Sequence, residues 1–133
     1  MAAHRVPYAA TASVAYPKDL MEKVDKAKEI RGCKILHVMA PCPTGWGYDP
    51  ALTVKVGKMA VELGLWYLAE YENEKIKLNY MPKELKPVDD YLKIQKRFRH
   101  LNPEDYQEIN EIRNNEWDRF IKKFGLQIQN PAS

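Results

Sequence analysis

Two kinds of hydrophobic spacing alternate along the first 80 residues of the chain. Four short runs are rich in apolar residues or alternate between apolar and polar positions, as strands do, and they lie at residues 5–13, 33–40, 65–73 and 75–80. Between the first three runs, apolar residues recur at helical spacing in residues 17–30 and 50–63. The pattern predicts strand, helix, strand, helix and strand, with the last two strands joined as a hairpin by the turn from Glu72 to Lys75.

Proline and glycine mark the expected ends of both helices. Pro17 and Pro50 suit the first helical turn, and Asp49 is a good cap for the second helix. Gly32 and Gly64 follow the last apolar positions, where a left-handed residue commonly ends a helix.

The run CKILHVMA at residues 33–40 is almost continuously apolar, which is typical of a strand covered on both faces. Short links between alternating strands and helices imply right-handed parallel crossovers and therefore the α/β class. Three such strands rarely complete a doubly wound domain. We therefore expect the sheet to be the C-terminal part of a larger one.

The character of the chain changes after residue 80. A short helix is expected over residues 88–95, and a long one begins at Asn102 and Pro103 with acidic residues in its first turn and lysines in its last. The apolar stripe of the long helix is expected to comprise Tyr106, Ile109, Ile112, Trp117, Phe120 and Phe124. We divide the chain into a partial α/β domain over residues 1–80 and a helical C-terminal extension over residues 81–133 that is not an independent domain. The long helix is expected to dock either on its own sheet or on a neighbouring subunit.

Composition excludes several classes of protein. The chain has 133 residues, 45% hydrophobic and 29% charged, which are values of a soluble globular domain. Its apolar runs are far shorter than the roughly 20 residues that cross a bilayer, and no secretory signal is evident, so a cytoplasmic protein is predicted. A net charge of +3 gives no indication of nucleic-acid binding.

A stiff loop, PCPTGWGY at residues 41–48, follows the second strand. Prolines on both sides of Cys42 fix the backbone around the thiol, and the two glycines of the loop permit close backbone approach. Open α/β sheets bind ligands at this end of their strands. A fixed thiol with backbone N–H groups nearby and an apolar wall such as Trp46 suits a thiolate bound to an iron–sulfur cluster.

Two other interpretations of Cys42 stay open. It can be a small, half-buried packing residue in a proline-rich turn. It can also be a nucleophile with His37 as its base, although their spacing directs the two side chains to opposite faces and no third group is evident. With only Cys33 as a second cysteine, the chain cannot complete a four-thiolate site, so any metal at Cys42 needs ligands from elsewhere.

Three segments carry a resemblance to a known family. In order, they are AAHRVPYAATAS, ILHVMAPCPTGWGYDPALTVKVGKMAVELGLWYLAEYEN and LKPVDDYLKIQKRFRHL. Together they resemble the C-terminal part of the beta subunit of pyruvate:ferredoxin oxidoreductase (pyruvate synthase), over roughly residues 2–124. The pairing of PCPTGW with KPVDDYLKIQKRFRHL is more specific than either motif alone.

The resemblance implies the C-terminal portion of a thiamine diphosphate-binding fold and part of a CoA-dependent enzyme that decarboxylates a 2-oxoacid, with pyruvate favoured. Electrons pass through iron–sulfur clusters to ferredoxin, and acetyl-CoA is formed from pyruvate. Cys42 matches the fourth ligand of the 4Fe–4S cluster nearest the thiamine diphosphate, and the other three cysteines lie upstream. Cys33 matches no ligand and is expected to be a packed core residue. The implied partners are the upstream part of the beta subunit, the other oxidoreductase subunits and ferredoxin.

The chain also departs from the family. It lacks the Gly-Asp-Gly motif that holds Mg²⁺ and the diphosphate, and it lacks the three upstream cluster cysteines. We therefore expect that this chain alone neither binds thiamine diphosphate nor turns over substrate, and we assign it no catalytic residue. The alternative from a different class is a non-catalytic α/β interaction or assembly module.

The basic run KIQKRFRH at residues 93–100 has two interpretations. Its cations Lys93, Lys96, Arg97 and Arg99 can attract acidic ferredoxin or hold the phosphates of CoA. Alternatively, the run is a solvated helix end with no binding role.

Overall fold

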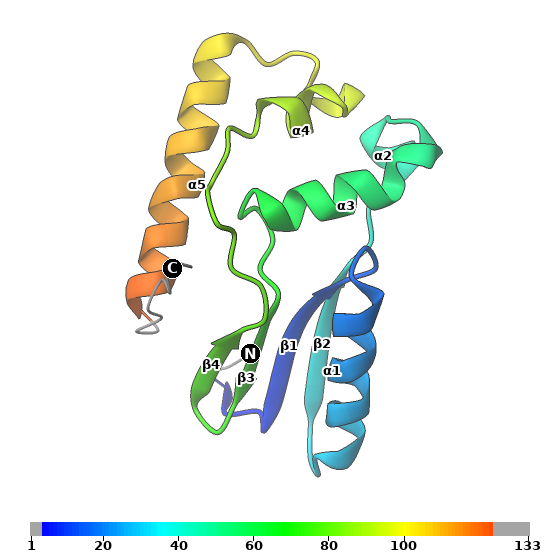
Figure 1. The fold of residues 1–133 in the computed structure, drawn as a ribbon, viewed down its shortest axis with the longest axis vertical. Helices are drawn as coiled ribbons and strands as arrows, with labels where there is room; N and C mark the ends of the chain where they lie inside the picture. The colour runs from blue at the N-terminus through cyan, green and yellow to red at the C-terminus, as the bar shows by residue number, and fades with distance from the viewer. Residues whose placement is uncertain (1–3, 124–133) are drawn as a thin grey trace, which may run out of the picture.

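The computed structural model describes residues 4–123, which form a sheet with one helix on its face and a second group of helices above it in the view of Figure 1. The α/β class predicted from the sequence is confirmed. None of the described helices has the length and apolar character needed to span a bilayer.

The sheet has four strands in the order β2-β1-β3-β4. Their bounds are β1 (Tyr8–Ser13), β2 (Lys34–Met39), β3 (Ala69–Glu72) and β4 (Lys75–Leu78). β2 runs parallel to β1, whereas β3 is antiparallel to both β1 and β4. The register places Ala10 opposite Leu36 on one side and Glu70 on the other. The predicted hairpin is confirmed, and its turn residues Asn73 and Glu74 both have positive φ.

The direction of β3 corrects the prediction of parallel crossovers, which holds only for the unit from β1 to β2. Helix α3 (Thr53–Glu62) lies across the carboxyl ends of β1 and β2 instead of alongside the sheet (Figure 1). Gly57 allows this approach, because a Cβ there would lie 2.7 Å from Cβ of Ala15 and 3.4 Å from Cγ of Pro41. The chain leaves α3 still at the carboxyl ends, so the next strand runs back in the opposite direction.

β3 is also shorter than the predicted run at residues 65–73. The N–H groups of Leu65 and Trp66 both donate to the Ala60 carbonyl at 2.9 Å and thereby cap α3. The Trp66 indole N–H donates to the Ala12 carbonyl at 2.9 Å. These residues therefore join α3 to the sheet before β3 begins.

β2 departs from the expectation of a strand covered on both faces. It is the outermost strand, and its residues are exposed or half-buried, with Val38 37% exposed. Helix α1 (Pro17–Glu29) packs on one face only, where Tyr8, Ala10 and Ala27 are buried with Ile30 and Leu36 against them. In the described part of the chain, no strand pairs with the outer edge of β2.

The remaining helices form the second and larger core. They are α2 (Pro43–Trp46), the 3₁₀ helix η2 (Pro50–Leu52), α3, α4 (Asp89–Lys93), the 3₁₀ helix η3 (Lys96–Phe98) and α5 (Pro103–Lys123). The predicted helix after Asp49 thus begins as a 3₁₀ turn, with the Asp49 carboxylate accepting the Ala51 N–H at 2.9 Å. The buried residues of this core are Tyr48, Val56, Ala60, Leu63, Val88, Tyr91 and Leu92.

α5 packs against its own chain. Trp117 is 5% exposed, and the Phe120 ring stacks on Tyr67 with centroids 4.3 Å apart. Arg113, also 5% exposed, donates to the carbonyls of Leu63 and Lys86. The predicted stripe is wrong at Ile112, which is 54% exposed, and its last member, Phe124, lies outside the described residues. The division of the chain at residue 80 stays a prediction.

Candidate metal-ligand loop

Cys42 lies where the chain leaves β2 and enters α2, and its side chain is exposed. The residue has an extended backbone and precedes the first turn of α2, where Pro43 follows it. The sulfur accepts the Gly45 N–H at 3.4 Å, and the Cys42 carbonyl accepts the Trp46 N–H at 2.9 Å. The thiol is therefore presented to solvent from a defined turn, which does not support the interpretation of Cys42 as a half-buried packing residue.

Gly47 ends this turn in a left-handed conformation. Its φ of 73° favours glycine, and its N–H donates to the Pro43 carbonyl at 2.8 Å. The Gly47 carbonyl accepts the Lys96 N–H at 3.0 Å, which links the loop to η3. A Cβ on Gly47 would lie only 2.8 Å from Cβ of Lys96, so glycine is also required for this contact.

Arg97 makes a second link between η3 and the loop. Its guanidinium lies 4.1 Å from the centroid of the Trp46 ring and 4.5 Å from that of Phe98. Its Nε donates at 2.9 Å to the amide oxygen of Gln95, which is itself 1% exposed. The basic run therefore has a positioning role that the sequence interpretation missed, because no spacing in the sequence pairs Arg97 with Trp46.

Comparison with known proteins identifies relatives of this chain. The chain is 55% identical over 111 residues to pyruvate synthase subunit PorB of Methanothermobacter thermautotrophicus, covering 84% of this chain and 38% of the relative. It is 51% identical over 109 residues to PorB of Methanocaldococcus jannaschii, covering 82% of this chain and 37% of the relative. Ketoisovalerate oxidoreductase subunit VorB of Pyrococcus abyssi is 45% identical over 123 residues, covering 90% of this chain and 39% of the relative.

The chain is homologous to the C-terminal part of PorB-like beta subunits. The resemblance to the pyruvate synthase beta subunit is thus confirmed. The chain spans about two fifths of the length of these relatives. No family model matches it.

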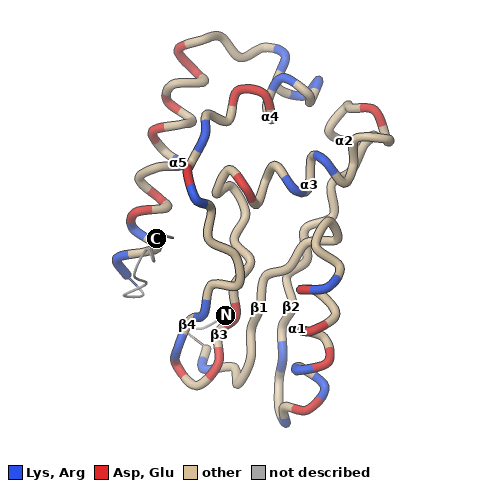
Figure 2. Tube along the Cα trace, in the orientation of Figure 1, with Lys and Arg blue, Asp and Glu red and all other residues tan. Residues whose placement is uncertain are grey.

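Beside the Cys42 loop lies an open hollow of about 500 Å³. Its lining residues are Thr44, Gly45, Trp46, Gly47, Lys96, Arg97, Arg99 and His100, a set that includes no carboxylate. Figure 2 shows basic positions gathered where the chain passes from α4 into η3, next to α2. Within residues 4–123, Lys96, Arg97 and Arg99 form no ion pair. The surface around the Cys42 loop is therefore positively charged.

His37 is not paired with Cys42 by any described hydrogen bond. The imidazole is exposed on β2 and meets the Trp66 ring edge-on, with centroids 4.8 Å apart. It lines a groove on the face of the sheet, whereas Cys42 lies in the loop beyond the strand. The arrangement does not support a Cys–His nucleophile.

Cys33 corrects another expectation. It was predicted to pack in the core, but it is exposed. The reason is its position just before β2, the uncovered outer strand, and directly after Gly32, which has a positive φ. In residues 4–123, no three His, Cys, Asp or Glu side chains gather closely enough to hold a metal ion.

Proposed function

We propose that this chain is part of the beta subunit of a 2-oxoacid:ferredoxin oxidoreductase, with pyruvate as the substrate of the complete complex. The support is an identity of 51–55% to three PorB subunits named for pyruvate synthase, compared with 43–45% to VorB subunits named for ketoisovalerate oxidoreductase; two other PorB subunits are 45% and 39% identical. The complete complex would use thiamine diphosphate with Mg²⁺, CoA and ferredoxin. This chain supplies no catalytic residue and is inactive alone.

Within that subunit, we assign Cys42 as one thiolate ligand of a 4Fe–4S cluster. The observation that carries this assignment is an exposed thiol on a loop fixed at several points, with the Gly45 N–H directed at the sulfur. Thiolate is the usual protein ligand of such clusters, and an N–H donor to the sulfur stabilises its negative charge. The donor set fits the group, with three further thiolates required from the rest of the subunit.

The surrounding residues hold this ligand in place. The bond between Gly47 and Lys96 and the stacking of Arg97 on Trp46 fix the loop against η3. A bound cluster would accept and pass on single electrons. The positive surface formed by Lys96, Arg97 and Arg99 favours approach of an acidic partner such as ferredoxin.

Anaerobic reconstitution with iron and sulfide tests the assignment. The chain would be co-expressed with the remaining portion of PorB from M. thermautotrophicus, and cluster formation followed by visible absorption and electron paramagnetic resonance. We expect a 4Fe–4S signal that is lost or strongly reduced in Cys42→Ala. Cys33→Ala is the matched control, because Cys33 is also an exposed free cysteine, and it should keep the signal. An unchanged spectrum in Cys42→Ala would instead favour a non-catalytic interaction or assembly module.

A further inference from the structure

The outer edge of β2 has the properties of an interior strand. Its sequence KILHVM has one charged residue, Lys34, at its start, and no proline or bulge protects its edge. Natural sheets usually blunt exposed edges with charges, prolines or bulges. Parallel strand pairs, such as β1 with β2, are normally covered on both faces by other parts of the protein.

The face of the sheet opposite α1 is also uncovered near β2. Side chains alternate along a strand, so residues next to the buried Tyr8, Ala10 and Leu36 point away from α1. They line a groove of about 240 Å³ whose residues include Ala9, Thr11, Ile35, His37, Tyr71 and Ile76. Phe120 of α5 reaches the rim of this groove through its stacking on Tyr67. Most of the groove is apolar, and the rest of the face has no helix on it (Figure 1).

The relatives of this chain are much longer than the chain itself. The chain spans 38% of the M. thermautotrophicus PorB subunit, so about three fifths of that relative has no counterpart in it. Such a length is enough to supply further strands and helices, whereas the described part of this chain offers none to the β2 edge. The edge and the groove are adjacent and apolar, so one α/β polypeptide can cover both.

We propose that the part of a PorB-like subunit that this chain does not span adds a strand to the free edge of β2 and covers the groove on the second face of the sheet. This inference rests on the proposed function, because the occupant is the rest of the same beta subunit. β2 leads directly into the Cys42 loop, so a strand paired with β2 brings that polypeptide beside the loop. The docking surface thereby explains how ligands from two stretches of sequence meet at one cluster.

Hydrogen exchange provides the first test. The chain would be mixed with the remaining portion of the M. thermautotrophicus PorB subunit, and amide exchange compared with that of the chain alone. We expect exchange at β2 to slow by at least about tenfold, because a new strand hydrogen bonds its free edge. α1, on the opposite face of the same sheet, is the internal control and should change little. Unchanged exchange at β2, or no association at all, would overturn the proposal.

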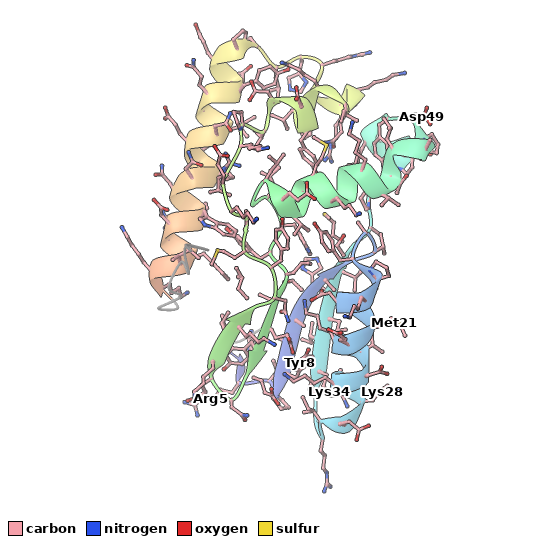
Figure 3. All side chains as sticks on the ribbon, in the orientation of Figure 1. Arg5, Tyr8, Met21, Lys28, Lys34 and Asp49 are labelled. Atoms are coloured by element: carbon pink, nitrogen blue, oxygen red, sulfur yellow. The ribbon has the colours of Figure 1, made fainter. Side chains whose placement is uncertain are left out.

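Charge substitutions provide the second test. Ile35→Glu and His37→Glu each place a carboxylate in the lining of the proposed groove, and each should weaken association by about tenfold or more. Met21→Glu is the matched control, because Met21 is 57% exposed and projects from the side of α1 away from the sheet (Figure 3). Equal association of all three variants would contradict the proposed surface, provided that exchange at β1 shows each variant to be folded.

A second copy of the chain is the competing occupant. Sedimentation of the chain alone would reveal a dimer that His37→Glu abolishes, and that result would overturn the proposal. The docking proposal and the cluster assignment can fail independently of each other. Protection of β2 with a signal that does not depend on Cys42 refutes the cluster assignment alone, whereas a signal that depends on Cys42 without protection of β2 refutes the docking surface alone.

Discussion

Glu70→Gln tests how the sheet is joined to α1. The Glu70 side chain is 8% exposed and accepts the Tyr8 hydroxyl at 2.9 Å, the Lys26 ammonium at 2.8 Å and the Asn79 amide at 2.7 Å. Lys77 lies 3.9 Å away, and Lys26 also pairs with Glu72 at 2.8 Å. One carboxylate therefore connects β1, α1 and the β3–β4 hairpin.

Its pKa sets the expected magnitude. Burial alone would raise the pKa of the Glu70 carboxyl, but the hydrogen bonds from Lys26, Asn79 and Tyr8 outweigh burial and lower the pKa from 4.5 to about 2. At about 1.4 kcal/mol per pH unit, this difference corresponds to roughly 3 kcal/mol of stability. Because the folded-state pKa is depressed, this stability is present above pH 4.5 and is lost as the pH falls towards about 2.

Urea unfolding at a series of pH values measures this contribution. We expect Glu70→Gln to lower the free energy of unfolding by about 2–3 kcal/mol near neutral pH, and the difference from the unmodified chain to shrink as the pH falls towards about 2. Glu116→Gln is the control, because its pair with Arg119 lies at the surface, where such pairs contribute at most about 1 kcal/mol. If the loss of unfolding free energy in Glu70→Gln stayed constant from neutral pH to about pH 2, the assigned role of the carboxylate would be refuted.

Two further substitutions test the packing of α5 and the shape of the loop. Arg113→Ala should lower the free energy of unfolding by about 2–4 kcal/mol, because it leaves the carbonyls of Leu63 and Lys86 without their donor. Arg119→Ala is the control: Arg119 is exposed, so its loss should change the free energy of unfolding by less than about 1 kcal/mol in the same urea titration. Gly47→Ala should lower the free energy of unfolding by about 1–3 kcal/mol and speed alkylation of Cys42, because residue 47 has a positive φ and an added Cβ would lie 2.8 Å from Cβ of Lys96. An unchanged alkylation rate would argue against that contact as a support of the loop.

Local signals in the sequence predicted local structure well. Gly32 and Gly64 have positive φ after their helices, and the Asn102 side chain caps α5 by accepting the N–H groups of Glu104 and Asp105. These outcomes depend on the conformations of a few neighbouring residues. The direction of β3 depends instead on where α3 ends relative to the sheet, which the contact between Gly57 and Ala15 fixes and hydrophobic spacing cannot show.

The stripe of α5 illustrates a different limit. The buried positions Arg113 and Trp117, together with Phe120, follow helical spacing, so the predicted period was right. An arginine occupies one position of the stripe, and the apolar Ile112 beside it faces away and is exposed. Residue type alone therefore assigned Ile112 to the buried stripe in place of Arg113. Nothing in the sequence indicates that the carbonyls of Leu63 and Lys86 accept hydrogen bonds from a buried guanidinium.

Around the sheet, the residues that are exposed against expectation lie at one edge. β2 was expected to be covered on both faces and Cys33 to be packed, and both lie at the one sheet edge that no described strand covers. β1, the next strand inward, has no such conflict, since Tyr8 and Ala10 are buried there as an interior strand requires. If the sequence pattern were simply misleading, misplaced apolar residues would be scattered over the sheet. Their confinement to the edge that leads into Cys42 is what a surface awaiting the rest of a PorB-like subunit would produce.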